Sequence, residues 1–111
     1  MMEYPTHSEG PFVVISLTGE VDMNYSPQAR QQILAHLDGQ RHVLVDLSQV
    51  SYIDSSGVAS LVEGLQKAKS SNLRFGLVGA SRASMLVLRL ARLDRVFPLY
   101  GTLEDALGKQ A

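Results

Sequence analysis

Two adjacent serines follow an aspartate in the sequence D-S-S-G at residues 54–57. The apolar run Val43–Leu47 before them has the character of a buried strand, and residues from Val58 onward place apolar side chains at helical spacing. Ser55 and Ser56 are therefore predicted at a helix N-terminus, where free backbone N–H groups and the helix dipole stabilise negative charge. A serine there can be switched by phosphorylation, which favours a phosphoserine-controlled binding module over an enzyme.

The same residues also have a purely structural interpretation. A hydroxyl at a helix start commonly caps backbone N–H groups, and Ser56 could do only that. Ser55 could be the cap while Ser56 carries a phosphate, or Asp54 could be the cap instead. Gly57 lets the backbone turn and lets a partner loop approach closely.

The sequence around Ser56 lacks the other groups that a catalytic serine requires. A serine hydrolase needs a histidine, an acid and an oxyanion hole, and D-S-S-G is not the G-x-S-x-G elbow. His7, His36 and His42 are scattered and lack metal-ligand spacing. The sequence contains no glycine-rich loop with a lysine, so it gives no indication of nucleotide hydrolysis. We therefore expect no enzymatic activity, no cofactor and no metal.

Composition narrows the class of protein. The 111 residues suit one domain spanning 1–111, and 45% of them are hydrophobic, as in globular chains. A net charge of −1 argues against nucleic acid or an anionic membrane as the main partner. The chain has no cysteine, no signal-peptide pattern at its start and no apolar run near the ~18 residues of a membrane span. A cytoplasmic protein without membrane insertion is expected.

Hydrophobic patterning predicts alternating strands and helices. The predicted strands are an edge strand at 3–8, Phe12–Leu17, Val43–Leu47, Leu73–Val78 and Val96–Tyr100. Predicted helices run from a Ser26 cap with Pro27 first to a left-handed Gly39, from Gly57 to Ser70, from a Ser81 cap to about Leu93, and from a Thr102–Asp105 capping box. Alternation after the first hairpin implies parallel strands joined by helical crossovers.

The segment 85–93 is rich in leucine and is predicted to be core. Exposure of Met85 or Leu86 would instead indicate a contact patch. The arginines of this region are interpreted as a solvated helix face rather than a phosphate site. They are Arg82, Arg89, Arg92 and Arg95.

Nearly the whole chain resembles a STAS domain, and more narrowly a bacterial anti-sigma factor antagonist. The resemblance is carried by the order of elements, by G-E-V-D at 19–22, by V-L-V-D-L at 43–47 and by Y-I-D-S-S-G-V at 52–58. It implies an α/β STAS-domain fold, with a mixed, mostly parallel sheet of about 4–5 strands and about four helices.

The resemblance also implies a partner-switching cycle. The unphosphorylated antagonist binds an anti-sigma factor serine kinase, a histidine-kinase-like ATPase, and thereby frees a sigma factor. Phosphorylation at Ser56 releases the antagonist, and a PP2C-type phosphatase resets it. Asp22 and Asn24 fall where family members contact the kinase. The residues Asp54, Ser55 and Gly57 around the phosphosite complete the expected partner surface.

One alternative keeps the fold but changes the system. Some STAS domains are small subunits of lipid-transporting ABC systems, bound to the ATPase. These often lack the doubled serine, so Ser55 and Ser56 favour the sigma pathway.

Overall fold

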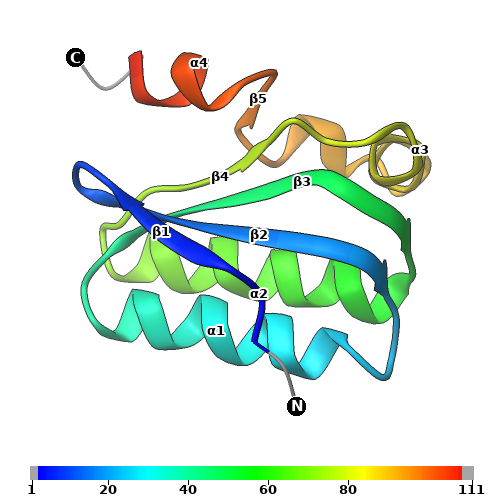
Figure 1. The fold of residues 1–111 in the computed structure, drawn as a ribbon, viewed down its shortest axis with the longest axis horizontal. Coiled ribbons are helices and arrows are strands. Elements are labelled where there is room, and N and C mark those ends of the chain that lie inside the picture. Colours follow the sequence, from blue (N-terminus) through cyan, green and yellow to red (C-terminus); the bar gives the residue numbers. More distant parts are fainter. Residues whose placement is uncertain (1–2, 109–111) are drawn as a thin grey trace.

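Five strands form one sheet in the order β1-β2-β3-β4-β5 in the computed structural model, which describes residues 3–108 (Figure 1). The strands are β1 (Thr6–Glu9), β2 (Phe12–Val21), β3 (His42–Ile53), β4 (Phe75–Val78) and β5 (Leu99–Tyr100). The helices are α1 (Ser26–Asp38), α2 (Ser55–Ser70), α3 (Arg82–Leu90), the 3₁₀ helix η1 (Leu93–Arg95) and α4 (Leu103–Gly108). The predicted α/β order and mixed sheet are confirmed.

The first hairpin gives the sheet its antiparallel edge. β1 pairs with β2 antiparallel, with Glu9 opposite Phe12 across a turn that places Gly10 at φ 58°. The other three strand pairs are parallel. The predicted edge strand therefore occurs, at Thr6–Glu9 rather than at residues 3–8, and the predicted parallel crossovers are confirmed.

Two cores lie on opposite faces of the sheet because β2 alternates between them. Val13, Ile15 and Leu17 belong to the larger core with residues of α1 and α2, whereas Phe12 and Val14 join the smaller core beneath α4. Figure 1 shows α1 and α2 side by side below the sheet and α4 above it.

Strand β3 is much longer than the predicted Val43–Leu47. Beyond Leu47 the chain continues to pair with β2, through irregularities of register, as far as Ile53 opposite Val21. Val50 and Ile53 still point into the core, while Ser51 and Tyr52 between them are exposed. β3 therefore runs directly into Asp54, with no loop between strand and helix.

Both predicted ends of α1 are corrected. Pro27 lies in the first turn as expected, but the N-cap is Tyr25 and no side chain caps the helix. The hydroxyl of Ser26 instead donates a hydrogen bond to the hydroxyl of Ser56. At the other end Gly39 has φ −77°, and the left-handed residue is Gln40 with φ 64°, one position later.

Near the C-terminus the regular elements are shorter than predicted. α3 ends at Leu90, and η1 follows after Arg92 takes a left-handed conformation. β4 begins at Phe75 rather than Leu73, and β5 contains only Leu99–Tyr100, after Pro98, which has no backbone N–H to donate.

The predicted caps of the last two helices are confirmed. The Ser84 backbone N–H donates to the Ser81 hydroxyl at 3.1 Å, and the Asp105 N–H donates to Thr102 Oγ1 at 3.1 Å. Among residues 3–108, no helix has the length and apolar character that crossing a bilayer requires.

Candidate functional site

Asp54 caps helix α2. Its Oδ1 accepts hydrogen bonds from the backbone N–H groups of Ser56 at 2.9 Å and Gly57 at 3.1 Å. Of the three candidate caps, the structure therefore selects Asp54. Because the carboxylate satisfies these N–H groups, the hydroxyls of Ser55 and Ser56 are not required for capping.

The Ser56 hydroxyl lies between Asp54 and helix α1. It donates to Asp54 Oδ1 at 2.6 Å and accepts from the Ser26 hydroxyl at 2.9 Å. The Ser56 side chain is half-buried, whereas Ser55 is exposed. The pKa of Asp54 is held below its ordinary value, chiefly by the hydrogen bond from Ser56 and further by backbone N–H groups of Gly57, Ser56 and Met23. Asp54 is therefore a carboxylate at neutral pH, beside the serine that the sequence singled out.

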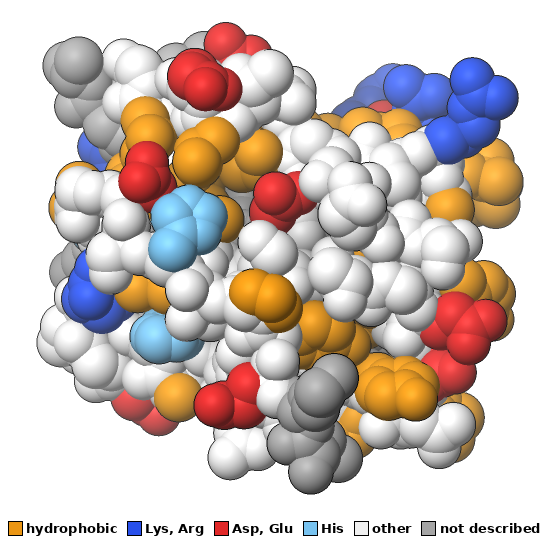
Figure 2. Space-filling model, in the orientation of Figure 1, with side chains coloured by type: hydrophobic (Ala, Val, Ile, Leu, Met, Phe, Trp, Pro, Cys, Tyr) orange, Lys and Arg blue, Asp and Glu red, His pale blue; other side chains and the backbone are white. Residues whose placement is uncertain are grey.

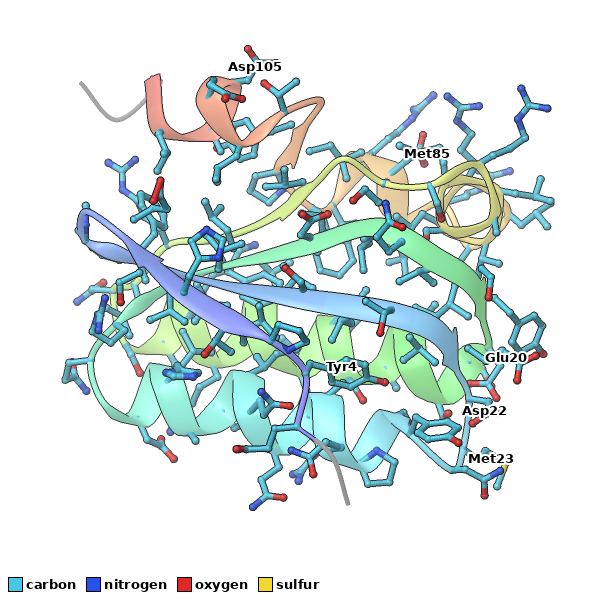
Figure 3. All side chains as sticks on the ribbon, viewed as in Figure 1. Tyr4, Glu20, Asp22, Met23, Met85 and Asp105 are labelled. Atoms are coloured by element: carbon cyan, nitrogen blue, oxygen red, sulfur yellow. The ribbon has the colours of Figure 1, made fainter. Side chains whose placement is uncertain are left out.

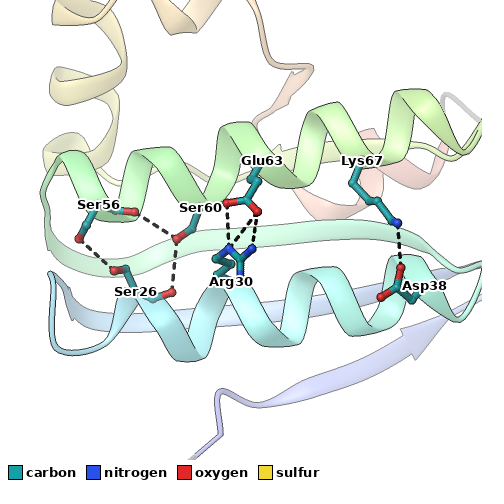
Figure 4. A network of polar contacts seen from close by, with 7 residues as sticks. All are labelled: Ser26, Arg30, Asp38, Ser56, Ser60, Glu63 and Lys67. Carbon is teal, nitrogen blue, oxygen red and sulfur yellow. Dashed lines mark hydrogen bonds and ion pairs between the residues drawn. The ribbon is translucent and has the colours of Figure 1, made fainter.

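A third serine completes the contact between the two helices (Figure 4). The Ser60 hydroxyl lies 3.1 Å from the carbonyl oxygen of Ser56 and 3.3 Å from that of Ser26, and its single proton is shared between these two acceptors. We call Ser26, Ser56 and Ser60 the serine junction. Sequence reasoning treated Ser26 only as a helix cap. No local signal could reveal its true partner, because Ser26 and Ser56 are 30 residues apart.

Gly57 packs inside the domain. A Cβ at this position would lie 2.6 Å from Ile53 Cγ1 and 2.6 Å from the carbonyl oxygen of Val21. The missing side chain lets the first turn of α2 approach the ends of β2 and β3. A contact of Gly57 with a partner stays a prediction.

The turn after β2 lies beside the start of α2. Asp22 organises this turn, since its Oδ1 accepts from the Asn24 N–H at 2.9 Å and its carbonyl accepts from the N–H groups of Tyr25 and Ser26. The Asp54 N–H donates to the carbonyl of Val21 at 3.3 Å, which joins the two segments. The fold thus brings Asp22 and Asn24 to the same end of the sheet as the D-S-S-G motif. Figure 3 shows Asp22 at this end with Glu20 and Met23.

Three large apolar side chains at this end were missed from sequence. Met23, Tyr25 and Tyr52 are 76%, 51% and 50% exposed, and Tyr52 lies opposite Glu20 in the β2–β3 register. A methionine and a tyrosine within the short polar turn M-N-Y were the available signal, because such residues in a turn have little core to enter. We call Met23, Tyr25 and Tyr52 the turn patch.

The leucine-rich segment is only partly core, which corrects the prediction for it. Leu88 is buried, but Leu86 and Leu90 are 58% and 77% exposed, because the short helix α3 turns only one side toward the core. All four arginines of α3 and its continuation are exposed, as predicted, and Figure 2 shows basic side chains gathered at the upper right, over α3.

A shallow apolar groove separates α3 from α2 and reaches the D-S-S-G motif. Its volume is about 460 Å³. The groove is lined by Ser55, Val58, Ala59 and Val62 of α2 and by Val87 and Ala91 at α3 and its C-cap, with Glu63 and Gln66 further along α2. An apolar side chain of a partner could enter it next to Ser55.

Comparison with known proteins defines the class. The family model described as "Mlab, STAS domain" matches residues 6–103, which is most of the chain. The mixed sheet and the helix capped by Asp54 agree with this match. The chain therefore belongs to the STAS domain family.

Several relatives carry names from sigma factor regulation. The chain is 30% identical over 96 residues to the anti-sigma-F factor antagonist RsfB of Mycobacterium tuberculosis, covering 85% of this chain and 77% of that protein. It is 26% identical over 98 residues to the anti-sigma-B factor antagonist of Staphylococcus aureus, covering 86% and 82%. The crystal structure of an anti-sigma factor antagonist from Mycobacterium paratuberculosis matches with a TM-score of 0.87 at 32% identity, covering 96% and 91%. These similarities do not favour the ABC-transport alternative.

Proposed function

We propose that this protein is an anti-sigma factor antagonist controlled by phosphorylation of Ser56. In its unphosphorylated form, as one STAS domain in the cytoplasm, it binds an anti-sigma factor that is also a serine kinase with a histidine-kinase-like ATPase fold. Binding frees the sigma factor, phosphorylation of Ser56 releases the antagonist, and a PP2C-type phosphatase restores it. The antagonist itself catalyses no reaction.

The observation that carries this proposal is the position of the Ser56 hydroxyl. It belongs to the first turn of a 16-residue helix whose cap is a different residue, Asp54. The helix start can tolerate a phosphate, and the hydroxyl is not needed to cap backbone N–H groups. The named relatives are antagonists of anti-sigma factors, which supports the antagonist role in this proposal.

The proposed partner surface surrounds Ser56 on two sides. The turn patch offers exposed apolar side chains next to the acidic residues Glu20 and Asp22, and the α2–α3 groove opens beside Ser55. Exposed aromatic and methionine side chains are frequent anchors of protein interfaces. An interface over this end of the sheet would enclose Ser56.

Enclosure explains how one phosphate could control binding. Phosphorylation adds about −1.5 to −2 charges at neutral pH. In the free protein this charge faces water and the helix N-terminus, but a partner would bury it close to the Asp54 carboxylate. Burying a poorly paired charge in an interface costs about 2–5 kcal/mol, which is a loss of affinity of roughly 30-fold or more.

The first experiment is a pull-down from source-organism lysate with wild-type, Ser56→Ala, Ser56→Asp and Ser70→Asp baits, read by mass spectrometry. Ser70→Asp is the matched control, because it adds the same charge to an exposed serine at the far end of the same helix, away from the proposed partner surface. We expect a small histidine-kinase-like ATPase to bind wild type and Ser56→Ala and to be lost with Ser56→Asp. Incubation with ATP should release that ATPase from wild type but not from Ser56→Ala.

Two outcomes would contradict the proposal. An ATPase retained equally by Ser56→Asp and wild type would remove the switch from Ser56. An ABC-type ATPase retained by all four baits would assign the protein to lipid transport and leave Ser56 with a structural role.

A further inference from the structure

The hydroxyl that we propose as the phosphoacceptor is held from both sides. Its proton is directed to Asp54 Oδ1 at 2.6 Å, and its oxygen receives the proton of Ser26 at 2.9 Å. Donation and acceptance together fix the direction of the Ser56 side chain toward α1. The Ser56 oxygen therefore rests inside the serine junction and not in free solvent.

Ser26 connects this junction to the turn after β2. Ser26 is only 5% exposed, so its hydroxyl depends on a protein partner. Its backbone N–H donates to the carbonyl of Asp22 at 2.7 Å and closes the turn that contains Met23 and Tyr25. A change at the Ser26 hydroxyl is thus only a few covalent bonds from the turn patch.

Phosphorylation is incompatible with this arrangement. In transfer from ATP, Ser56 Oγ bonds to the γ-phosphorus, the bond from that phosphorus to ADP breaks, ADP keeps the electron pair, and the hydroxyl proton passes to a base of the kinase or to water. The product has no proton to give Asp54. Its phosphate dianion would stand beside a carboxylate and would have to leave the junction.

We propose that Ser26 is a positioning residue for Ser56 and that phosphorylation breaks their hydrogen bond, so that the modification also alters the Asp22–Tyr25 turn. The buried Ser26 hydroxyl loses its acceptor when the phosphate swings outward, and the first turn of α1 readjusts. A partner would then meet both a new charge at Ser56 and a changed turn patch. This inference rests on the proposed function for its biological meaning.

The test uses the full chain with phosphoserine inserted genetically at position 56, so no kinase is needed. The matched control is phosphoserine at position 55, which places the same group on the neighbouring exposed residue. Backbone amide shifts and hydrogen exchange are measured by NMR for residues 22–28 and for α2. We expect the Ser26 and Tyr25 amides to shift, and to exchange about tenfold faster, with phosphoserine at 56 but not at 55.

Uncharged variants separate the hydrogen bond from the charge. Ser26→Ala and Ser56→Ala should each perturb the amides of residues 22–28 in the same direction as phosphoserine 56, and Ser26→Thr should restore the wild-type pattern. In Ser26→Ala, phosphoserine at 56 should add little further change to this turn. If the turn depended on packing alone and not on the Ser26–Ser56 hydrogen bond, these variants would not perturb its amides in the same direction as phosphoserine 56.

The inference is overturned if phosphoserine 56 leaves the amides of residues 22–28 at their unmodified shifts and exchange rates. It is also overturned if phosphoserine 55 perturbs them equally, because charge alone would then be the cause. Failure of the proposed function has a different signature. In that case the pull-down finds no phosphorylation-sensitive ATPase, whatever the NMR of the isolated protein shows.

Discussion

The two ends of the α1–α2 interface are joined by different chemistry (Figure 4). At the end near Asp54, the serine junction connects the helices through short neutral hydroxyls that are partly or fully buried. Farther along, Arg30 pairs with Glu63 at 2.6 Å and Lys67 with Asp38 at 3.0 Å, all on side chains 42–63% exposed. We call these two pairs the ion-pair end.

The difference shows which end can serve as a switch. Exposed ion pairs are screened by salt and water, so adding or removing a charge there changes little. The hydroxyls of the serine junction are partly or fully buried and have protein acceptors, and a phosphate on Ser56 would remove the hydrogen bond that Ser56 donates to Asp54. The sensitive end is the one beside the turn patch.

The largest expected effect on stability comes from Gly57→Ala, which puts a Cβ 2.6 Å from Ile53 Cγ1 and the Val21 carbonyl oxygen. We expect the free energy of unfolding to fall by about 1–3 kcal/mol, since the helix start must move away from β2. Urea denaturation measures this change. Gly39→Ala is the control, because its Cβ would meet no atom closer than 3.4 Å and its φ is negative. Equal losses in both variants would mean that close packing at Gly57 is unimportant.

A smaller effect is expected from Ser26→Ala, which deletes the donor to Ser56 at the serine junction. The net contribution of such a hydrogen bond is about 1 kcal/mol, so the free energy of unfolding should fall by roughly that amount. Denaturation of Ser55→Ala provides the comparison, because the Ser55 side chain is exposed and its loss should have almost no effect. A Ser26→Ala protein as stable as Ser55→Ala would contradict the importance of the junction.

Titration of two carboxyl groups distinguishes the ends without measuring stability. The pKa of Asp54 is lowered chiefly by the Ser56 hydroxyl, and the pKa of Glu63 is lowered chiefly by its hydrogen bond with Arg30. NMR titration should show Ser56→Ala raising the pKa of Asp54 alone and Arg30→Gln raising that of Glu63 alone. A shift of both groups in either variant would show that the ends are coupled.

The sign of the pH dependence follows from these directions. A carboxyl whose folded pKa lies below its unfolded value stabilises the fold above the unfolded pKa of about 4. That stabilisation is lost as the pH falls through the folded pKa. Ser56→Ala should therefore reduce the extra stability that Asp54 gives at neutral pH. The free energy of unfolding of this variant should then fall less steeply than that of wild type as the pH is lowered through the acid range.

The smallest effect is expected at the ion-pair end. The double variant Arg30→Gln with Glu63→Gln removes an exposed pair, and its melting temperature should fall by no more than a few degrees at low salt. At high salt the difference from wild type should shrink further. If the melting temperature of this double variant fell further than that of Ser26→Ala, the expected contrast between the two ends would be contradicted.

Sequence patterns predicted the order of elements well, because apolar residues at strand and helix spacing mark what must be buried. They predicted the ends of elements poorly where a distant residue decides. Ser26 looks like a helix cap in isolation, but its hydroxyl is taken by Ser56 across the helix interface. Strand β3 looked short because polar residues follow Leu47, yet its partner β2 continues to pair with it.

The candidate site was also predicted only in part, because several of its contacts join residues that are distant in the sequence. The D-S-S-G motif is contiguous, so its helix N-terminus could be recognised from local sequence. The turn patch and the serine junction require the ends of β2 and β3 to lie side by side, which only the fold decides. Leu86 and Leu90 follow a helical period but face away from the core, and periodicity cannot tell which side of a short helix is covered.

The direct passage from β3 into α2 has a consequence for enzyme selectivity. Asp54 is the one residue between the strand and the helix, so Ser56 lies in regular structure at the corner between β3 and α2 and not in a loop. A kinase that reads its substrate as an extended chain would have to unwind the first turn of α2 before it could bind. A kinase that recognises the folded corner finds its acceptor already ordered and loses less conformational entropy on docking. If Ser56 is phosphorylated as proposed, the shape of this corner would therefore select against kinases that bind only extended peptides.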